Sequence, residues 1–351
     1  MPKADSPLAN RSCDMIIVMK PESSKEEIDH VIKKVEGVGL KAVLLQGAER
    51  NVIACLGDKR DISQDFWNAL PGVEKAMPIL SPYKMASREV KHTNTEVLLG
   101  KFPFGAKKVG IIAGPCAVEN KNQLLSIAQS VKEAGAVALR GGAFKPRTNP
   151  YTFQGLMEEG LEYLAEAREK TGLPVVTEVL SPEHVNMVAK YADVLQIGTR
   201  NMGNFVLLKA VGEQPKPVIL KRGMSATLEE FLLAAEYILS RGNTNVILCE
   251  RGIRTFEDHT RFTLSLSAVP HLKQLTHLPV IVDPSHGTGK SSLVNPMSKG
   301  AVAVGCDGLL IEVHINPEKA LVDGAQTIST EEFKRLVKEL KPLAQAVGRD
   351  V

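Results

Sequence analysis

Short runs of apolar, mostly β-branched residues recur along most of this chain, and amphipathic stretches separate them. Eight such runs follow residue 108, at residues 109–113, 137–140, 175–179, 194–197, 218–221, 246–249, 280–283 and 309–313. Most are entered from Gly, Pro, Asn or Asp, and the stretches between them have helical periodicity. Strands that alternate with helices predict a parallel sheet, and eight repeats predict a closed (β/α)8 TIM barrel over residues 109–351.

A different order of elements precedes the barrel. Strands are predicted at residues 15–19, 42–46, 51–56 and 73–79, and helices at residues 24–36 and 62–70. Ser24 and Glu27 have the spacing of a capping box at the start of the first helix. The order βαββαβ is typical of a small α+β ferredoxin-like domain, predicted here over residues 14–79.

This N-terminal domain contains no cluster of nucleophiles or metal ligands, so we expect it to be regulatory. The alternative is a plain stabilising or oligomerisation domain, because fold alone does not fix function. Residues 1–13 are expected to form a flexible N-terminus. Residues 80–108 are expected to form a linker that includes a hairpin closing the barrel bottom.

Composition narrows the class of protein. The chain has 351 residues, of which 44% are hydrophobic, and a formal net charge of +3. It has no polybasic run with interleaved aromatics, which argues against nucleic acid as a partner. Residues 1–14 lack the continuous apolar core typical of a signal peptide, and no later stretch reaches about 18 apolar residues, so we expect no membrane association. The five cysteines, at positions 13, 55, 116, 249 and 306, have no paired spacing, which favours a reducing, cytoplasmic location.

Charged or reactive side chains stand at or just beyond the end of every predicted barrel strand. They are Cys116, Arg140, Glu178, Arg200, Lys221, Arg251, Asp283 with His286, and Glu312 with His314. Strand ends are exposed and therefore often polar, whatever the function. A complete ring of such groups is nevertheless what a barrel enzyme requires, because its active site lies at the carboxyl ends of the strands.

Four potential metal ligands fall in this region: Cys116, His286, Glu312 and Asp323. One thiol, one imidazole and two carboxylates suit Mn, Fe, Co, Cu or Zn, and suit Mg or Ca alone poorly. We therefore expect a divalent transition metal and leave its identity open. His314 competes for the imidazole position or supports the ligands from outside, since strand alternation places it on the same side as Glu312.

A second group of strand-end residues is cationic. It comprises Arg140, Lys145, Arg147, Lys221 and Arg251, several of them beside glycines that let a ligand approach the backbone. Arg and Lys at several strand ends indicate a site for phosphate and carboxylate together. Small phosphorylated metabolites are therefore the expected substrates.

Residues 286–291 (HGTGKS) resemble the end of a phosphate-binding P-loop. That motif needs glycine at the position occupied by Pro284, which argues against a nucleotide switch. We expect Gly287 and Gly289 to give a flexible loop over the barrel mouth instead.

Several motifs resemble those of the 3-deoxy-D-arabino-heptulosonate 7-phosphate (DAHP) synthase family. They lie at residues 114–119 (GPCAVE), 140–148 (RGGAFKPRT), 196–198 (QIG) with Arg200 and Asn201, and 283–286 (DPSH). The likeness extends from residue 109 to about 348, and residues 15–79 resemble the ferredoxin-like regulatory domain of some members. It implies condensation of phosphoenolpyruvate with erythrose 4-phosphate and release of phosphate, at the start of the shikimate route.

The resemblance also implies roles for individual residues. Cys116, His286, Glu312 and Asp323 would be the metal ligands. Phosphoenolpyruvate would be held by Arg140, Lys145, Lys221 and Arg251, and erythrose 4-phosphate by Lys145, Pro146, Arg147 and Thr148. The catalytic candidates are Lys145, as a proton donor, and His286. Water would be directed by Glu178, by Asp283 or by a metal-bound hydroxide. Tyr or Phe would act as an effector at the N-terminal domain. The enzyme would be a homo-oligomer, and a tetramer is expected.

Two other functions stay open. A sibling enzyme joins phosphoenolpyruvate to arabinose 5-phosphate to make 3-deoxy-manno-octulosonate 8-phosphate on the same barrel. It has an Ala-Asn-Arg-Ser type segment where this chain has residues 145–148, which favours the shorter aldose here. The second alternative is a catalytically silent effector-binding protein, against which the presence of Cys116 and Lys145 argues.

Overall fold

The computed structural model describes residues 15–46, 50–57, 63–78, 82–147 and 149–351. The chain forms two compact units, Met1–Thr93 and Asn94–Val351, which we call unit 1 and unit 2. The division falls within the segment predicted to be the linker. The predicted N-terminus of residues 1–13, and residues 62 and 79 of predicted elements, lie outside the described residues.

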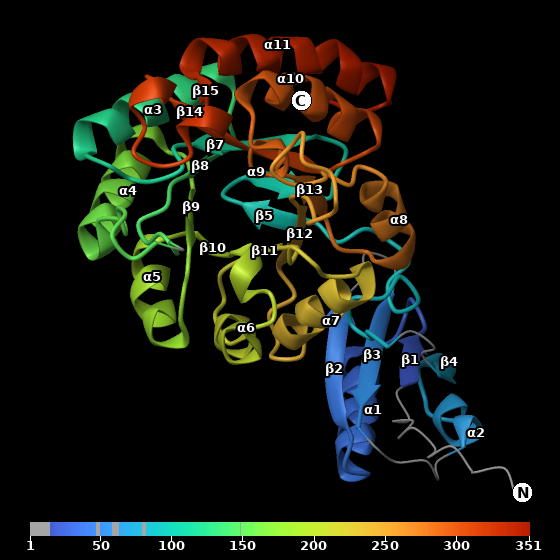
Figure 1. The fold of residues 1–351 in the computed structure, drawn as a ribbon. Helices are drawn as coiled ribbons and strands as arrows, with labels where there is room; N and C mark the ends of the chain where they lie inside the picture. Colours follow the sequence, from blue (N-terminus) through green and yellow to red (C-terminus); the bar gives the residue numbers. More distant parts are fainter. Residues whose placement is uncertain (1–14, 47–49, 58–62, 79–81, 148) are drawn as a thin grey trace, which may run out of the picture. The chain divides into compact units, whose positions relative to one another are not determined.

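Unit 1 has the predicted ferredoxin-like order of elements (Figure 1). These are β1 (Met15–Met19), α1 (Lys25–Gly37), β2 (Lys41–Gln46), β3 (Asn51–Leu56), α2 (Gln64–Asn68) and β4 (Val73–Pro78). The strands pair antiparallel in the order β2-β3-β1-β4. Ile17 and Ile53 on one sheet face pack with Val31 of α1 and Trp67 of α2. The predicted capping box is present, with the Ser24 hydroxyl accepting from the Glu27 N–H.

Unit 2 is the predicted closed parallel barrel. Its strands are β7 (Gly110–Gly114), β8 (Ala138–Arg140), β9 (Val175–Glu178), β10 (Val194–Ile197), β11 (Val218–Lys221), β12 (Val246–Glu250), β13 (Val280–Val282) and β14 (Gly308–His314). All eight predicted strands are therefore confirmed, with ends that differ by one residue at most. The barrel closes where β14 pairs with β7, with Gly308 opposite Gly110, and a short strand β15 (Ile328–Ser329) extends β14.

Helices surround the barrel strands (Figure 1). The α-helices are α3 (Lys121–Ala134), α4 (Met157–Thr171), α5 (Val185–Tyr191), α6 (Phe205–Gly212), α7 (Leu228–Leu239), α8 (Ala268–Leu275), α9 (Pro284–Thr288), α10 (Ser291–Ala303) and α11 (Thr330–Ala346). Single 3-10 turns are η1 (Pro182–His184), η2 (Thr199–Asn201), η3 (Pro317–Lys319) and η4 (Gly324–Gln326). In α11 the Ser329 hydroxyl caps the helix, and Phe333, Leu336 and Leu340 form its buried face, as helical spacing requires.

A hairpin of β5 (Val97–Leu99) and β6 (Phe102–Phe104) fills the amino-terminal end of the barrel. Val97, Leu99 and Phe104 pack in one apolar cluster with side chains from all eight strands, including Ile112 of β7 and Ile281 of β13. A side chain on Gly110 or Gly308 would bring its Cβ within 2.5 Å of Phe104, so both strands begin with glycine. The core at this end leaves the opposite end of the barrel for the site.

The segment after β13 differs from its prediction. Residues 284–288 form the short helix α9 rather than a flexible loop over the mouth. Asp283 caps this helix by accepting from the His286 N–H, Pro284 supplies a helical φ at its first position, and Gly289 ends it with φ 70°. Gly287 is packed so closely that a Cβ there would lie 2.7 Å from Leu264. In the part of the chain that the structure describes, no helix has the length and apolarity needed to cross a membrane.

Candidate metal centre and cationic mouth

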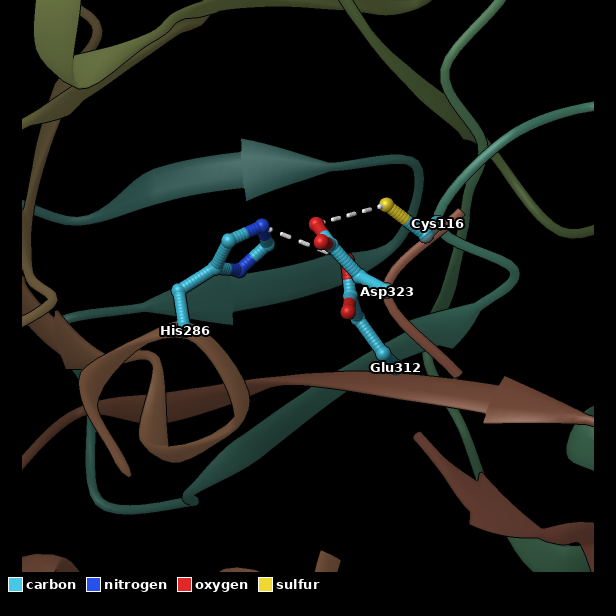
Figure 2. Close-up of side chains that lie close together, drawn as sticks. All are labelled: Cys116, His286, Glu312 and Asp323. Carbon is cyan, nitrogen blue, oxygen red and sulfur yellow. Dashed lines mark hydrogen bonds and ion pairs between the residues drawn. The ribbon is translucent and has the colours of Figure 1, made fainter. Parts of the chain in front are cut away.

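Four predicted ligands converge at the carboxyl ends of the barrel strands (Figure 2). Cys116 follows β7, His286 lies in α9, Glu312 lies in β14, and Asp323 lies in the loop before η4. One potential ligand atom from each, the thiol sulfur, an imidazole nitrogen or a carboxylate oxygen, lies within 4.8 Å of the other three. Residues up to about 200 positions apart in sequence thus form one compact set of donors.

His286 is held in the orientation that a metal ligand needs. Its Nδ1 lies 2.7 Å from Asp283 Oδ2, and its Nε2 lies 3.3 Å from Glu312 Oε1. Asp283 Oδ2 also accepts from Lys221 Nζ at 2.6 Å. Burial lowers the pKa of His286 and outweighs the opposing charge of Asp283, so the imidazole is neutral near pH 7. A carboxylate at one ring nitrogen and a second nitrogen directed at the cluster is the usual arrangement of a ligating histidine.

Glu312 is fully buried but ionised. Burial alone would raise its pKa, but His286, which is charged at the acid pH where this carboxyl titrates, and the cations Arg140 and Lys145 hold the pKa well below its usual range. Arg140 Nη1 donates to Oε1 at 2.8 Å, and Gln326 Nε2 donates to Oε2 at 2.6 Å. These contacts fix a negative oxygen inside the cluster.

Cys116 comes from a tight exit of the chain from β7. At Gly114 a Cβ would lie 2.0 Å from the Arg140 carbonyl oxygen, so only glycine fits there. The Cys116 sulfur lies 3.2 Å from Lys145 Nζ and 3.5 Å from Asp323 Oδ2. Burial, with the charge of Glu312, raises the pKa of this thiol. It therefore keeps its proton near pH 7 unless a metal displaces it.

The donor set fits a divalent transition metal. Soft sulfur, borderline imidazole and two hard carboxylates are the mixture that such ions accept. Asp323 supplies the second carboxylate of the set, and its backbone has a left-handed conformation with φ 53°. Its Oδ1 accepts from Arg261 Nη1 at 3.3 Å, and the same nitrogen donates to Gln326 at 2.9 Å.

A cavity of about 280 Å³ opens beside the metal-ligand set, and we call it the mouth. Its cationic lining consists of Lys145, Arg147, Arg200, Lys221, Arg251 and Arg261, and its carboxylates are Glu178 and Asp323. The buried Arg251 side chain lines the mouth, and the buried Arg140 side chain lines a smaller pocket that shares Lys145 and Glu178 with it. Among the described residues, Arg140 Nε and Arg251 Nη1 are buried N–H donors with no acceptor. Because an unsatisfied buried donor is costly, these two atoms indicate positions for the oxygens of a bound anion.

The structure separates the predicted site residues into two layers. Pro146 and Arg147 line the mouth, and so does Glu178, which accepts from Gln196 Nε2 at 3.3 Å. Asp283 is fully buried below the mouth, with its carboxylate bonded to Lys221 and His286. Thr148 lies outside the described residues.

His314 is not one of the clustered donors. It is buried, with Nε2 2.5 Å from Gln123 Nε2 and Nδ1 accepting from the Asn316 N–H at 3.0 Å. The sequence left two alternatives for His314, a metal ligand or a side chain that supports the ligands from outside. Its contacts fit the second alternative.

Three residues that contribute to the site do not lie at the end of a strand, so their position in the sequence did not indicate them. Arg261 and Phe262 come from the long loop after β12, and Gln326 from η4. The Arg251 guanidinium lies over the Phe262 ring, 4.0 Å from its centroid. Arg200 also lines the mouth, as its position just beyond a strand end suggests.

Comparisons with known proteins identify relatives of both units. The model of the DAHP synthetase I family matches residues 90–346, and that of the DAHP synthase ferredoxin-like domain matches residues 15–81. Phospho-2-dehydro-3-deoxyheptonate aldolase of Thermotoga maritima is 52% identical over 334 residues, covering 95% of this chain and 99% of that protein. A crystal structure of the DAHP synthase from Thermotoga maritima has a TM-score of 0.77 at 51% identity, covering 96% of this chain and 99% of that one.

The chain is also similar, more distantly, to the sibling enzymes. 2-Dehydro-3-deoxyphosphooctonate aldolase of Syntrophotalea carbinolica is 33% identical over 254 residues, covering 67% of this chain and 91% of that protein.

Proposed function

This chain belongs to the DAHP synthetase I family, and from that premise we propose that it condenses phosphoenolpyruvate with erythrose 4-phosphate. The products are DAHP and inorganic phosphate, and the reaction is the first step of the shikimate pathway. The observation that carries the proposal is a transition-metal donor set beside a mouth lined by six cations. A metal site next to anion sites is suited to a reaction that joins two phosphorylated substrates, one of which is an aldehyde.

Phosphoenolpyruvate is the ligand for the inner cations. Arg251 Nη1 offers a buried N–H donor in the mouth, which Lys221 also lines, and Arg140 Nε offers a second one at a smaller pocket that shares Lys145 and Glu178 with the mouth. A phosphate and a carboxylate on one small molecule would satisfy donors that the described protein atoms leave unpaired. Cations placed beforehand would also stabilise the negative charge of the phosphate as it becomes a leaving group.

Erythrose 4-phosphate is the ligand for the outer part of the mouth. Pro146 and Arg147 line it, and Arg147 Nε donates to Thr152 Oγ1 at 3.1 Å, which orients the guanidinium. Thr148 remains part of this proposal on the basis of the sequence motif alone. A divalent metal held by Cys116, His286, Glu312 and Asp323 would supply a Lewis acid that polarises the aldehyde.

Lys145 is the proposed proton donor to the hydroxyl that forms from the aldehyde oxygen. Burial would lower its pKa, but the neighbouring Cys116 sulfur and the charges of Glu178 and Glu312 outweigh burial and raise it. The ammonium group is therefore protonated near pH 7. It donates to the Cys116 carbonyl at 3.0 Å and lies 3.2 Å from the sulfur, so it is held next to the reacting atoms.

Water must also add to C2 of phosphoenolpyruvate, and the contacts favour Glu178 as the group that directs it. Glu178 lines the mouth, where water has access. Asp283 has no exposed surface, and its carboxylate is already bonded to Lys221 and His286. We therefore assign Asp283 to orienting His286 rather than to activating water.

Phosphate release from phosphoenolpyruvate tests the proposed reaction. We expect metal-dependent turnover with erythrose 4-phosphate and little with arabinose 5-phosphate, and loss of turnover with a chelator. Preference for arabinose 5-phosphate would move the chain to the sibling activity, and no turnover with either sugar would support a silent binding protein. Cys116→Ser should lose metal and most turnover, and full activity of this variant in chelator would contradict the proposed centre.

We further propose that unit 1 is regulatory, that Tyr or Phe is its effector, and that the enzyme is a tetramer. The match to the DAHP synthase ferredoxin-like domain supports a regulatory unit. Deleting residues 1–80 should abolish any response to these amino acids, and an unchanged response would contradict the role. The cysteine spacing supports a cytoplasmic location.

A further inference from the structure

A buried ion pair lies beside the mouth of unit 2, next to two of its cations. Arg222 Nη1 donates to Glu250 Oε2 at 2.9 Å, and the two residues are 6% and 0% exposed. Arg222 directly follows Lys221, and Glu250 directly precedes Arg251. Lys221 and Arg251 line the mouth, whereas Arg222 and Glu250 do not belong to its lining. The pair can therefore act on an anion in the mouth only through its neighbours.

The Glu250 side chain closes the turn that carries Arg251. Its Oε1 accepts from the backbone N–H of Gly252 at 2.7 Å, so Arg251 lies between the two ends of this hydrogen bond. Gly252 has φ 89°, and a Cβ there would lie 2.7 Å from Phe262 Cβ. The Glu250 carbonyl accepts from the backbone N–H of Asp283 at 2.8 Å. Both the backbone and the side chain of Glu250 thus fix the place where Arg251 leaves β12.

Arg222 connects this turn to the neighbouring strand ends. Its backbone N–H donates to the Cys249 carbonyl, and its Nε donates to the Ala226 carbonyl, both at 3.0 Å. The Arg222 carbonyl accepts from Thr199 Oγ1 at 3.0 Å, and Thr199 directly precedes Arg200. The pair therefore links the exits of β10, β11 and β12. Each of these three exits carries one cation that lines the mouth.

The Arg251 guanidinium is useful to an anion in one narrow position. It lies over the Phe262 ring, 4.0 Å from the centroid, and its Nη1 is a buried donor that has no acceptor among the described residues. An oxygen of a bound anion satisfies this donor only when the two atoms are about 2.7–3.2 Å apart. A small shift of the Arg251 backbone would therefore lose the bond, although Arg251 itself remained.

We propose that Glu250 and Arg222 form a positioning pair, which holds Arg251 where its Nη1 meets an oxygen of bound phosphoenolpyruvate. The inference deepens the function proposed above and rests on it for the identity of the anion. Neither residue of the pair is catalytic, since neither lines the mouth. Loss of the pair should weaken binding of the anion. It should leave the KM for erythrose 4-phosphate unchanged, because Pro146 and Arg147 lie in the outer part of the mouth.

Replacing both residues together tests the positioning role without leaving a buried charge unpaired. Removing one partner of a buried ion pair is strongly destabilising, whereas exchanging both for apolar side chains of similar volume is often neutral. The first variant is therefore Arg222→Met with Glu250→Met. Isothermal titration of the metal-loaded full chain with phosphoenolpyruvate and, separately, with inorganic phosphate measures anion binding. This variant should bind both at least about tenfold more weakly, because a hydrogen bond to a charged group is lost.

A second variant restores the turn without the ion pair. In Arg222→Met with Glu250→Gln, the amide oxygen at position 250 can accept from the Gly252 N–H as Glu250 does. The variant should bind both anions about 2- to 10-fold more tightly than the first one, the usual effect of one neutral hydrogen bond. It should still bind them more weakly than the unchanged chain.

Asp307→Asn is the matched control. Asp307 is also a buried carboxylate, 1% exposed, and it too accepts from a cation and a backbone N–H. These are Lys273 Nζ at 2.7 Å and the Val280 N–H at 2.8 Å. It directly precedes β14, at the amino-terminal end of the barrel. Its replacement should lower the free energy of unfolding and leave anion binding unchanged.

The outcomes distinguish a positioning role from general damage to the fold, which thermal unfolding of each variant monitors. The proposal is overturned if the methionine variant is folded and binds both anions as tightly as the unchanged chain, if the glutamine variant binds no better than the methionine variant, or if Asp307→Asn weakens binding equally. Should the methionine variant not fold, equal affinities of the glutamine variant and the unchanged chain overturn it. An unchanged chain that binds neither anion overturns it as well.

Steady-state kinetics separate this proposal from the proposed reaction. The methionine variant should have a higher KM for phosphoenolpyruvate and an unchanged KM for erythrose 4-phosphate, and equal increases in both would contradict the positioning role. An unchanged chain that binds phosphoenolpyruvate but catalyses no condensation would refute the proposed reaction and leave the positioning role standing.

Discussion

Glu119 accepts a hydrogen bond from the backbone N–H of Leu321, with its Oε1 2.8 Å from that nitrogen. Glu119 lies three residues after Cys116, and Leu321 lies two residues before Asp323. The second oxygen of Glu119 accepts from Gln123 at 3.1 Å and is 3.7 Å from His314 Nε2. One carboxylate therefore ties together the two chain segments that carry the sulfur and the last oxygen of the metal-ligand set.

Replacing Glu119 with alanine should weaken metal binding about 10- to 100-fold, the usual effect of losing a residue that positions a ligand. Asp323 would then be free to move with its loop, while all four ligands remain. Competition of the purified protein with a chelator for Co²⁺ measures the change. Glu318→Ala removes the same group from an exposed position of the same loop and should have no effect. Equal affinities for the two variants would contradict the positioning role.

Metal binding should tighten as pH rises. Burial holds the pKa of the Cys116 thiol above its usual value, so the metal-free protein carries that proton near neutral pH, whereas His286 is already neutral. Binding then releases one proton, and the apparent affinity should rise about tenfold for each pH unit between about pH 6.5 and 8. Chelator competition at several pH values measures the slope. Cys116→Ser should lack this slope, and a pH-independent affinity of the unchanged chain would refute proton release.

Much of the barrel could be predicted because its strands have a local signal. Each buried parallel strand is a continuous apolar run, and amphipathic helices separate the runs. Cys116, His286 and Glu312 stand at or near the ends of such strands, where topology alone brings them together. The fold and the set of converging ligands were thus visible in the sequence.

Other parts of the site depend on contacts that no local pattern records. Arg261, Phe262 and Gln326 lie in connections whose paths are set by packing against the rest of unit 2. The helix α9 was missed because two closely spaced glycines, Gly287 within it and Gly289 just after it, suggest a loop. The Asp283 cap and Pro284 outweigh that preference.

Phe262 should contribute to binding of phosphoenolpyruvate through Arg251. A cation over an aromatic ring is worth about 0.5–2 kcal/mol, so Phe262→Leu should raise the KM for phosphoenolpyruvate about 2- to 30-fold with a smaller change in kcat. Steady-state kinetics with erythrose 4-phosphate in excess measure both. Phe256→Leu is the control, because Phe256 lies in the same loop and is 94% exposed. A change in kcat alone would argue against this contact.

The hairpin at the barrel bottom should stabilise unit 2. Leu99 is 1% exposed and packs among the strand side chains, so Leu99→Ala should lower the free energy of unfolding by about 2–5 kcal/mol. Leu98 is 58% exposed, and Leu98→Ala should change it by less than about 0.5 kcal/mol. Denaturant unfolding followed by circular dichroism compares the two. Similar losses for both variants would show that the hairpin is not anchored by Leu99.

Closure of the barrel between β7 and β14 determines when during biosynthesis this protein can acquire a metal. Cys116 is made early, whereas Glu312 and Asp323 are near the end of the chain. A ribosome-bound chain that stops before β14 has an open sheet and only half of its ligands. The complete set of four donors therefore exists only once translation of unit 2 is almost finished.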